Sequence, residues 1–210
     1  MRTTATSTVA TPETGVPSTP PAAADEARRM RLLEGALATF ARFGYRKTSM
    51  EEVARAAGIS RQGLYLHFPT KDDLFRAAVS YALQEAITAA NARLYDTTQP
   101  IDARLVGAFD EWIGRYVGMF GGDVSDIMEA SHLLLGTALA DHDARFLESV
   151  TKVVRGSGLP AAYKSAALNA RQLAETLHAT AKGLKHGCKT RAEFQERIQV
   201  AVRALCMPLG

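Results

Sequence analysis

The chain has 210 residues, of which 47% are hydrophobic and 22% charged, and its formal net charge at pH 7 is +3. This length supports one sizeable hydrophobic core or two small ones, and no apolar run approaches the roughly 18 residues that a membrane span needs. The N-terminus lacks the charged-then-apolar pattern of a secretory signal, so we expect a cytoplasmic protein without a membrane partner. Cys188 and Cys206 lie in helical sequence without metal-ligand spacing, and we expect both to be reduced.

Composition and periodicity divide the chain into three predicted segments. Residues 1–24 are mostly Thr, Pro, Ala and Ser, and because they have almost no large apolar side chains to bury, we expect a disordered tail. The remainder places apolar residues at helical spacing with almost no strand-like alternation, which predicts an all-α protein. We expect a small helical domain over 25–75 and a larger one over 76–210.

Capping signals define two short helices within the first domain. After a helix over 25–43, a second helix begins at Ser49, whose side chain can cap the amide of Glu52 in a capping box. Gly58 suits the left-handed conformation that closes a helix, and Ser60 is the natural N-cap of the third helix. Two short helices joined by a tight turn predict a helix-turn-helix unit.

Outward residues of the third helix are candidates for reading DNA. They are Arg61, Gln62, Gly63, Tyr65, Leu66 and His67. Arg61 can chelate guanine O6 and N7, and Gln62 can pair with adenine. Leu66 or His67 can meet a base edge or a thymine methyl, and Gly63 removes bulk where the helix would approach the groove. A histidine exposed to solvent at this position is also compatible with no role at all.

A second set of residues is suited to the phosphate backbone. Three helix N-termini supply amides and hydroxyls at Ser49, Ser60 and Thr70. Further candidates are Thr48, Tyr65 and Lys71. Each cap would also serve in any helical protein, and the tyrosine can simply cover the edge of a small core. A local surplus of basic residues supports a nucleic-acid partner or an ordinary solvated face; it consists of Arg42, Arg46, Lys47, Arg55 and Arg61.

Residues 48–74 read T-S-M-E-E-V-A-R-A-A-G-I-S-R-Q-G-L-Y-L-H-F-P-T-K-D-D-L, which resembles the DNA-binding signature of the TetR family of bacterial transcriptional regulators nearly end to end. With the first helix, the resemblance covers roughly residues 26–75. It implies a homodimer whose two heads present the third helix to a palindromic double-stranded DNA operator, and a C-terminal domain that senses a small molecule. Relatives often carry Thr or Ala at the position of Gly63, so we expect Arg61 or Gln62 to take more of the readout.

The second domain begins with three predicted helices. Their ranges are 102–120, 123–140 and 143–154, separated by Gly121-Gly122 and Asp141-His142. Aromatic residues recur here at steps of three and four, a spacing that is typical of a core and also of a cavity wall. The candidates for a small-molecule pocket are Trp112, Tyr116, Met128, His132 and Tyr163.

Metal binding and catalysis have no positive signal in the sequence. His132, Asp141, His142 and Asp143 do not include a histidine pair at i, i+4, and the last three are typical of a turn before a helix. A paired-carboxylate arrangement, a Gly-rich phosphate loop and a nucleophile elbow are also missing. We therefore expect no metal, no cofactor, no catalytic residue and no enzymatic activity.

Two long helices are predicted to end the chain, over 161–186 and 191–207. Their apolar faces consist of Leu168, Leu173, Leu177 and Leu184, followed by Phe194, Ile198, Val202 and Leu205. Such faces suit either the chain's own core or a four-helix dimer interface to which each subunit contributes a pair. The family resemblance favours the homodimer.

These observations predict a repressor that an unidentified, lipophilic small molecule releases from its operator. An alternative keeps the DNA binding but drops the sensor, so that the C-terminal domain only dimerises and the protein acts as an activator or an architectural protein. A helical enzyme with a vestigial head is the third reading, and the sequence contains no catalytic cluster to support it.

Overall fold

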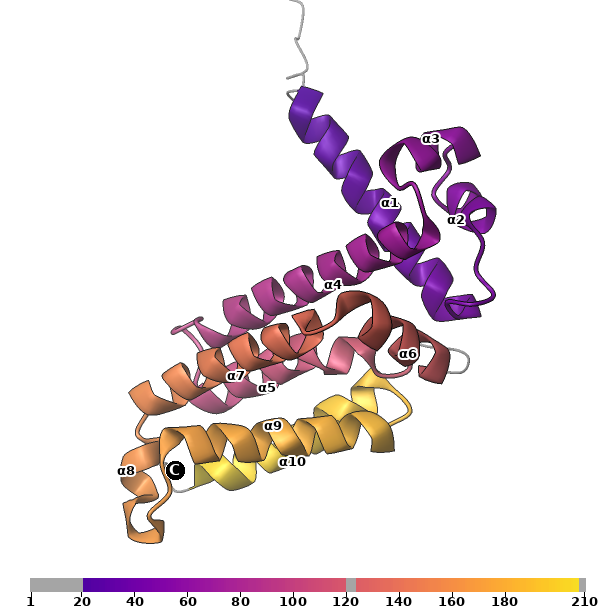
Figure 1. The fold of residues 1–210 in the computed structure, drawn as a ribbon. Coiled ribbons are helices and arrows are strands. Elements are labelled where there is room, and N and C mark those ends of the chain that lie inside the picture. Colours follow the sequence, from indigo (N-terminus) through magenta and orange to yellow (C-terminus); the bar gives the residue numbers. More distant parts are fainter. Residues whose placement is uncertain (1–20, 120–123, 208–210) are drawn as a thin grey trace, which may run out of the picture.

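The computed structural model describes residues 21–119 and 124–207, and every regular element within these ranges is helical, which confirms the predicted all-α class (Figure 1). In chain order the elements are α1 (Pro21–Phe43), α2 (Met50–Ala56), α3 (Arg61–His67), α4 (Lys71–Leu94), α5 (Ile101–Trp112), η1 (Gly114–Tyr116), α6 (Val124–Leu135), α7 (Ala138–Gly156), α8 (Leu159–Ala162), η2 (Lys164–Ala166), α9 (Ala170–Gly187) and α10 (Arg191–Cys206). The predicted tail lies outside the described residues up to residue 20, and α1 begins at Pro21, earlier than the sequence suggested.

Buried side chains form two hydrophobic cores, which α4 connects. We call α1 to α3 the head and α4 to α10 the body. The head core joins α1, α2, α3 and the first half of α4 to Ile127, Ala130 and Leu135 of α6. The body core joins the second half of α4 to α5, α7, α9 and α10. The domain boundary expected near residue 75 therefore falls inside one continuous helix, and α6 packs on the head although it follows α5 in the chain.

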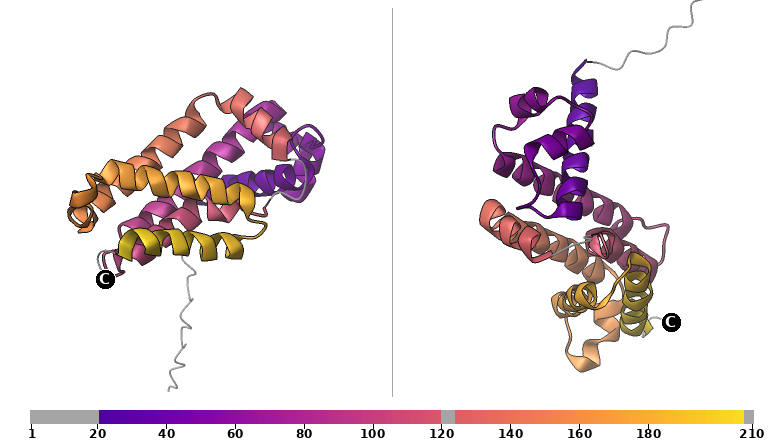
Figure 2. Two further views of the ribbon diagram at one scale, coloured as in Figure 1. Left: turned by 90° about the horizontal axis from the view of Figure 1, so that it is seen from below. Right: turned by 90° about the vertical axis from the view of Figure 1, so that its right-hand side faces the viewer.

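The helices of the body lie in layers below the head. α9 and α10 lie on the side of the body farthest from α2 and α3 (Figure 1 and Figure 2). Small residues at steps of four make one face of α4, at Ala78, Ala82, Ala86 and Ala90, and each is at most 9% exposed. Alanine favours the helix and lets a neighbouring backbone come close, so α1 and α5 can pack directly on α4.

An aromatic cluster fills the body core, and an ion pair between the buried Asp110 and the partly exposed Arg191 closes one side of it. The Phe146 ring lies 5.2 Å from Phe109 in an edge-to-face contact and 5.2 Å from Trp112 in a stacked one. Asp110, which is 6% exposed, accepts hydrogen bonds from Arg191 Nε at 3.0 Å and Nη2 at 2.6 Å. This pair ties α5 to the start of α10.

The predicted helix over 102–120 is wrong at its C-terminal end, because α5 stops at Trp112. The chain passes close to α10 after this break and forms the short η1 turn. Gly114 permits the close approach, since a Cβ there would collide with the Asp110 carboxylate and lie 2.8 Å from the Phe194 ring. Phe120 and the predicted Gly121-Gly122 separator lie outside the described residues.

Two further boundaries differ from those expected. The break predicted at Asp141-His142 falls earlier, before α7 begins at Ala138, so that Asp141 lies in the first turn, where the helix dipole favours a carboxylate. The single helix predicted over 161–186 is interrupted by η2, and α9 starts again at Ala170. Asn169 caps α9 in a capping box that the sequence analysis had not identified.

The apolar faces of the last two helices belong to the chain's own core, apart from Leu168, which precedes α9 and is 37% exposed, contrary to the prediction. Leu173 and Leu177 of α9 are 3% and 2% exposed, and Phe194, Ile198 and Val202 of α10 are fully buried. Contacts with α5 and α7 cover these faces, so a second copy would have to use the outward faces of α9 and α10. None of the helices within residues 21–119 and 124–207 is both long and apolar enough to span a membrane.

Candidate nucleic-acid interface

The second helix of the head starts at a complete capping box. Ser49 Oγ accepts from the Glu52 amide at 3.2 Å, and the Glu52 carboxylate accepts from the Ser49 amide at 2.8 Å. These hydrogen bonds from Ser49 lower the pKa of Glu52. At the other end, Gly58 has a φ of +65°, which closes α2 and allows the Ile59 amide to donate to the Ala54 carbonyl at 3.0 Å. The predicted cap and turn are confirmed.

The third helix is anchored at both ends of its inner face. Ser60 is its N-cap and accepts from the Gly63 amide at 3.0 Å. Leu64 is fully buried and Phe68 is 5% exposed, as the spacing predicted. Only seven residues long, α3 is held by these contacts and by its cap, since a helix of this length is not stable by itself. Its opposite face is therefore presented in a fixed orientation.

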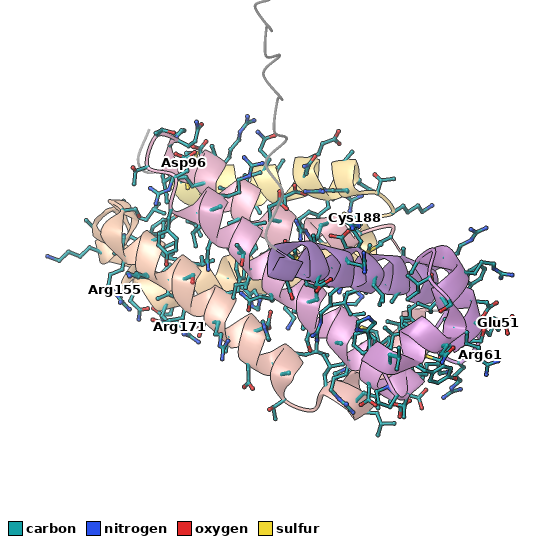
Figure 3. The ribbon with its side chains drawn as sticks, turned by 90° about the horizontal axis from the view of Figure 1, so that it is seen from above. Glu51, Arg61, Asp96, Arg155, Arg171 and Cys188 are labelled. Atoms are coloured by element: carbon teal, nitrogen blue, oxygen red, sulfur yellow. The ribbon has the colours of Figure 1, made fainter. Side chains whose placement is uncertain are left out.

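The candidate base-reading side chains lie on that exposed face. Arg61, Gln62, Tyr65, Leu66 and His67 are all exposed, and Leu66 reaches 81%. The Arg61 guanidinium lies 5.6 Å from the centre of the Tyr65 ring. Viewed from above, Arg61 lies at the outer edge of the head, far from Arg171 of α9 (Figure 3). Leu66 thus adds an apolar side chain to a face that also carries a guanidinium group and an amide.

Two candidate phosphate ligands are engaged elsewhere in the structure, contrary to expectation. Thr48 is 2% exposed and its hydroxyl donates to the Gly44 carbonyl at 2.6 Å, so that it stabilises the turn between α1 and α2. Lys71 Nζ donates to the Tyr45 carbonyl at 3.1 Å and lies 4.4 Å from the centre of the Tyr45 ring. Thr70 caps α4 as predicted and accepts from the Asp73 amide at 3.0 Å.

The local basic surplus is smaller in three dimensions than in the sequence, because Arg46 pairs with α6. Its amide donates to Asp126 at 2.8 Å, and its guanidinium lies 2.6 Å from Glu129. Both carboxylates come from the element that also completes the head core. Arg46 therefore joins the head to α6, and Lys47, Arg55 and Arg61 remain as exposed cations near α2 and α3.

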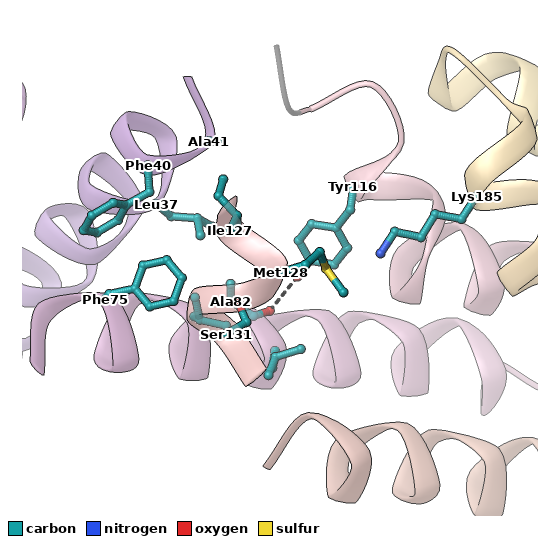
Figure 4. A pocket seen from close by; sticks show the side chains of 12 residues that line it. Leu37, Phe40, Ala41, Phe75, Ala82, Tyr116, Ile127, Met128, Ser131 and Lys185 are labelled. Carbon is teal, nitrogen blue, oxygen red and sulfur yellow. Dashed lines mark hydrogen bonds between the residues drawn. The ribbon is translucent and has the colours of Figure 1, made fainter. Parts of the chain in front are cut away.

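A cavity of about 120 Å³ lies directly beneath the head (Figure 4). Its walls come from α1, α4 and α6, with Tyr116 of η1 and Lys185 of α9 at one end. The lining residues are Leu37, Phe40, Ala41, Phe75, Val79, Ala82, Leu83, Tyr116, Ile127, Met128, Ser131 and Lys185. The Tyr116 hydroxyl donates to the Ala82 carbonyl at 3.0 Å, and burial raises the pKa of this tyrosine. A mostly apolar space with few polar groups is the usual form of a small-molecule site.

Two of the five residues proposed for a pocket wall, Tyr116 and Met128, line this cavity, and the other three do not. Trp112 faces the body core and its Nε1 donates to Asp143 at 3.3 Å. His132 points to solvent from α6. Tyr163 lies beyond α8, where its hydroxyl donates to the Leu205 carbonyl at 2.9 Å. These three residues lie in different parts of the fold, so the prediction that they share a pocket wall is wrong.

Most residues of the cavity wall were not predicted from the sequence, although the position of Lys185 could have indicated the site. This lysine lies four residues after Ala181 and seven after His178, so it occupies the buried stripe of α9. A lysine on an apolar stripe is unusual enough to mark a site. Burial lowers the pKa of its ammonium group, and the nearby Lys182 acts in the same direction. Among the described residues, no group of three His, Cys, Asp or Glu side chains is arranged to hold a metal ion.

Together, the tight α2–turn–α3 unit and its all-helical body define the class of helix-turn-helix proteins. Residues 32–78 match the pattern of the bacterial regulatory proteins of the tetR family. The N-terminal domain of the chain belongs to this family. The HTH-type transcriptional regulator RutR of Escherichia coli K12 is 37% identical over 57 residues, which cover 27% of this chain and 27% of RutR. The chain thus spans less than a third of the length of the curated relatives it matches.

Solved structures extend the likeness to the whole fold. A structure assigned to the TetR-family transcriptional regulators, from Mesorhizobium loti, has a TM-score of 0.60 at 19% identity and covers 87% of this chain and 96% of its own. A transcriptional regulator from Saccharomonospora viridis in complex with choline also has a TM-score of 0.60, at 22% identity, covering 85% of this chain and 96% of its own. At these identities the likeness concerns the fold.

Proposed function

We propose that the protein is a cytoplasmic, sequence-specific DNA-binding transcriptional regulator without enzymatic activity. The outer face of α3 carries this proposal, because a short helix anchored from behind presents Arg61, Gln62 and Leu66 outward next to further exposed cations. A helix presented in this way fits the major groove of B-DNA, which admits an α-helix and shows a distinct pattern of donors and acceptors at each base pair.

Each exposed residue of α3 has a role that its chemistry supports. Arg61 can bind guanine through O6 and N7, and Gln62 can bind adenine through N6 and N7. Leu66 can contact a thymine methyl, and His67 lies beside it on the same face. The Tyr65 hydroxyl and the amides at the capped starts of α2, α3 and α4 position the head on the phosphates. Thr48 and Lys71 would first have to release their internal hydrogen bonds.

A single head offers only this short contact, so we propose that two copies act together on a palindromic operator. Their recognition helices would enter successive major grooves about 34 Å apart. The interface would use the outward faces of α9 and α10, which retain exposed positions such as Val200, at 68%, and Arg171. Two-fold symmetry of the protein would then match the symmetry of the DNA site.

We further propose that a small molecule in the cavity releases the protein from DNA, which makes it a repressor. Three features support this coupling. The cavity is lined by α1, a helix of the head itself, through Leu37 and Phe40. It is also lined by α6, which holds Arg46 through Asp126 and Glu129. A fold neighbour contains choline, which supports ligand binding by this fold without indicating which ligand binds here.

For the effector to act, it must bind the released arrangement more tightly than the DNA-bound one. An occupant that pushes α1 or α6 outward would tilt the head relative to α4. Because the two half-sites lie about one helical turn apart, a small tilt in each copy moves both recognition helices out of register. The cavity then serves as the sensor and α6 as the link to the head.

Fluorescence anisotropy on DNA from upstream of the chain's own gene tests the assignment of α3. A variant with Arg61→Ala and Tyr65→Phe is expected to lose roughly tenfold or more in affinity, because a bidentate base contact contributes about 1 to 3 kcal/mol. The matched control is Arg155→Ala with Tyr95→Phe, which changes the same residue types at exposed positions of α7 and the end of α4, away from α3 and from the proposed dimer faces. Equal losses in both variants, or none in either, would show that α3 does not read the DNA.

A further inference from the structure

Among the described residues that line the cavity, Lys185 is the one with a charged side chain. Its side chain extends from α9 toward Tyr116 and Met128, with the amino end directed into the cavity (Figure 4). None of the hydrogen bonds or ion pairs within the described residues involves its ammonium group, whereas Lys182, one turn earlier, pairs with Asp143 at 3.1 Å. The described residues that line the cavity therefore supply no counter-charge to Lys185. The Asp143 carboxylate acts on its ammonium group from α7 but is already paired with His178 and Lys182.

A second polar group of the wall is also without a partner. Ser131 of α6 is 5% exposed and lines the cavity, and none of the hydrogen bonds within the described residues uses its hydroxyl. Both groups face the cavity and not packed protein, so an occupant that displaces water from the cavity must pair with them or leave them buried without a partner, which costs free energy. Burial accordingly lowers the pKa of Lys185. The unmet needs of these two groups are a negative charge and a hydrogen-bond acceptor, and a carboxylate supplies both.

We infer that the effector is a compact monocarboxylate, with its carboxylate on Lys185 and Ser131 and its apolar part against Phe40 and Phe75. This inference rests on the proposed sensor role of the cavity and adds the chemical class of the effector. A volume of about 120 Å³ is close to that of a cavity that holds benzene, so roughly six non-hydrogen atoms of a ligand fit inside it. Octanoate and phenylacetate are somewhat larger and serve as probes because the cavity is partly open.

Isothermal titration of the full chain without DNA tests the inference with three probes that share one tail. Octanoate is expected to bind about tenfold or more tightly than 1-octanol and octylamine, because a charge-assisted hydrogen bond in an apolar cavity is worth more than a neutral one. Lys185→Met keeps the apolar stem and should remove this preference by weakening octanoate about tenfold while 1-octanol is unaffected. Lys185→Arg should retain the preference for the carboxylate.

The control is Lys189→Met, which removes the same charge from an exposed position outside the cavity and should bind octanoate like the unaltered chain. Equal affinity of the unaltered chain for octanoate and 1-octanol would overturn the inference. Unchanged octanoate binding in Lys185→Met would also overturn it, because the lysine would then only cover apolar surface. Failure of both octanoate and phenylacetate to bind would also overturn it. Because no DNA is present, the titration tests only the chemical class of the ligand. The proposed DNA binding is tested separately by fluorescence anisotropy, and either proposal can fail without the other.

Discussion

Asp143 of α7 links its helix to α5 and α9, and its replacement should lower the free energy of unfolding by an amount that can be worked out from its contacts. One carboxylate oxygen lies 2.8 Å from His178 Nε2 and accepts from Trp112 Nε1 at 3.3 Å, and the other accepts from Lys182 Nζ at 3.1 Å. Burial raises the pKa of Asp143, but the hydrogen bonds and charges of His178 and Lys182 outweigh it and lower the pKa to about 2. The ionised form is therefore stabilised by the fold.

Replacing Asp143 with Asn should remove this stabilisation. A pKa of about 2 against an ordinary value of 3.8 corresponds to roughly 2.4 kcal/mol of unfolding free energy. The side chain is 30% exposed, so solvent screening reduces the expected loss to about 1 to 2 kcal/mol at pH 7. In a chain of this length, that loss lowers Tm by roughly 2 to 8 °C.

The pH dependence gives a sharper test than the loss itself. Since the carboxyl pKa is lower in the folded state, its contribution is complete above the unfolded value of 3.8 and disappears as the pH falls through about 2. The difference between the unaltered chain and Asp143→Asn should narrow to about half at pH 3. Urea unfolding at pH 7, 5, 4 and 3 measures it. The control is Asp25→Asn, the same change at an exposed position of α1. A difference between the unaltered chain and Asp143→Asn that stays constant with pH would refute the assigned contacts.

Two further predictions concern the turn of the head and the ion pair of the body. Gly58→Ala should lower the free energy of unfolding by about 1 kcal/mol, because φ is +65° there; the new Cβ itself meets no atom. Gly63→Ala lies within a helix and should leave that free energy unchanged or raise it by up to about 1 kcal/mol, with Ser60 Oγ shifting slightly from its position 3.1 Å from the new Cβ. Thermal unfolding ranks the two variants, and a more stable Gly58→Ala variant would contradict the prediction. Arg191→Met should cost about 1 to 2 kcal/mol in urea unfolding, because the buried Asp110 loses its cation but keeps the hydrogen bond from Gln195, and the Arg191 side chain is 43% exposed. An unchanged free energy of unfolding would show that the pair contributes nothing.

The head was largely predictable because its signals are local. The caps at Ser49, Ser60 and Thr70 and the left-handed Gly58 act over three or four residues, and the structure confirms each of them. Hydrogen bonds of this range are decided by neighbouring sequence, whatever the rest of the chain does. The exposed face of α3 followed from the inward positions of its apolar residues.

The body was less predictable because its breaks and its cavity depend on distant contacts. After the end of α5, Gly114 packs on Phe194, a residue far away in the sequence. The cavity is lined by Phe40, Met128 and Lys185 from three separate helices, and no local sequence pattern predicts that these residues lie close together. Trp112 was misassigned for the same reason, since its partner lies on another helix.

Selection of binding sites from a randomised DNA library tests the central claim most directly. The unaltered chain should enrich a two-fold symmetric motif whose half-sites lie about one helical turn apart. Arg61→Ala should enrich the same motif with lost preference at one position of each half-site, and Gln62→Ala should lose a different position. Enrichment of no motif, or of an identical motif by all three proteins, would contradict the assignment of α3 as the element that reads DNA.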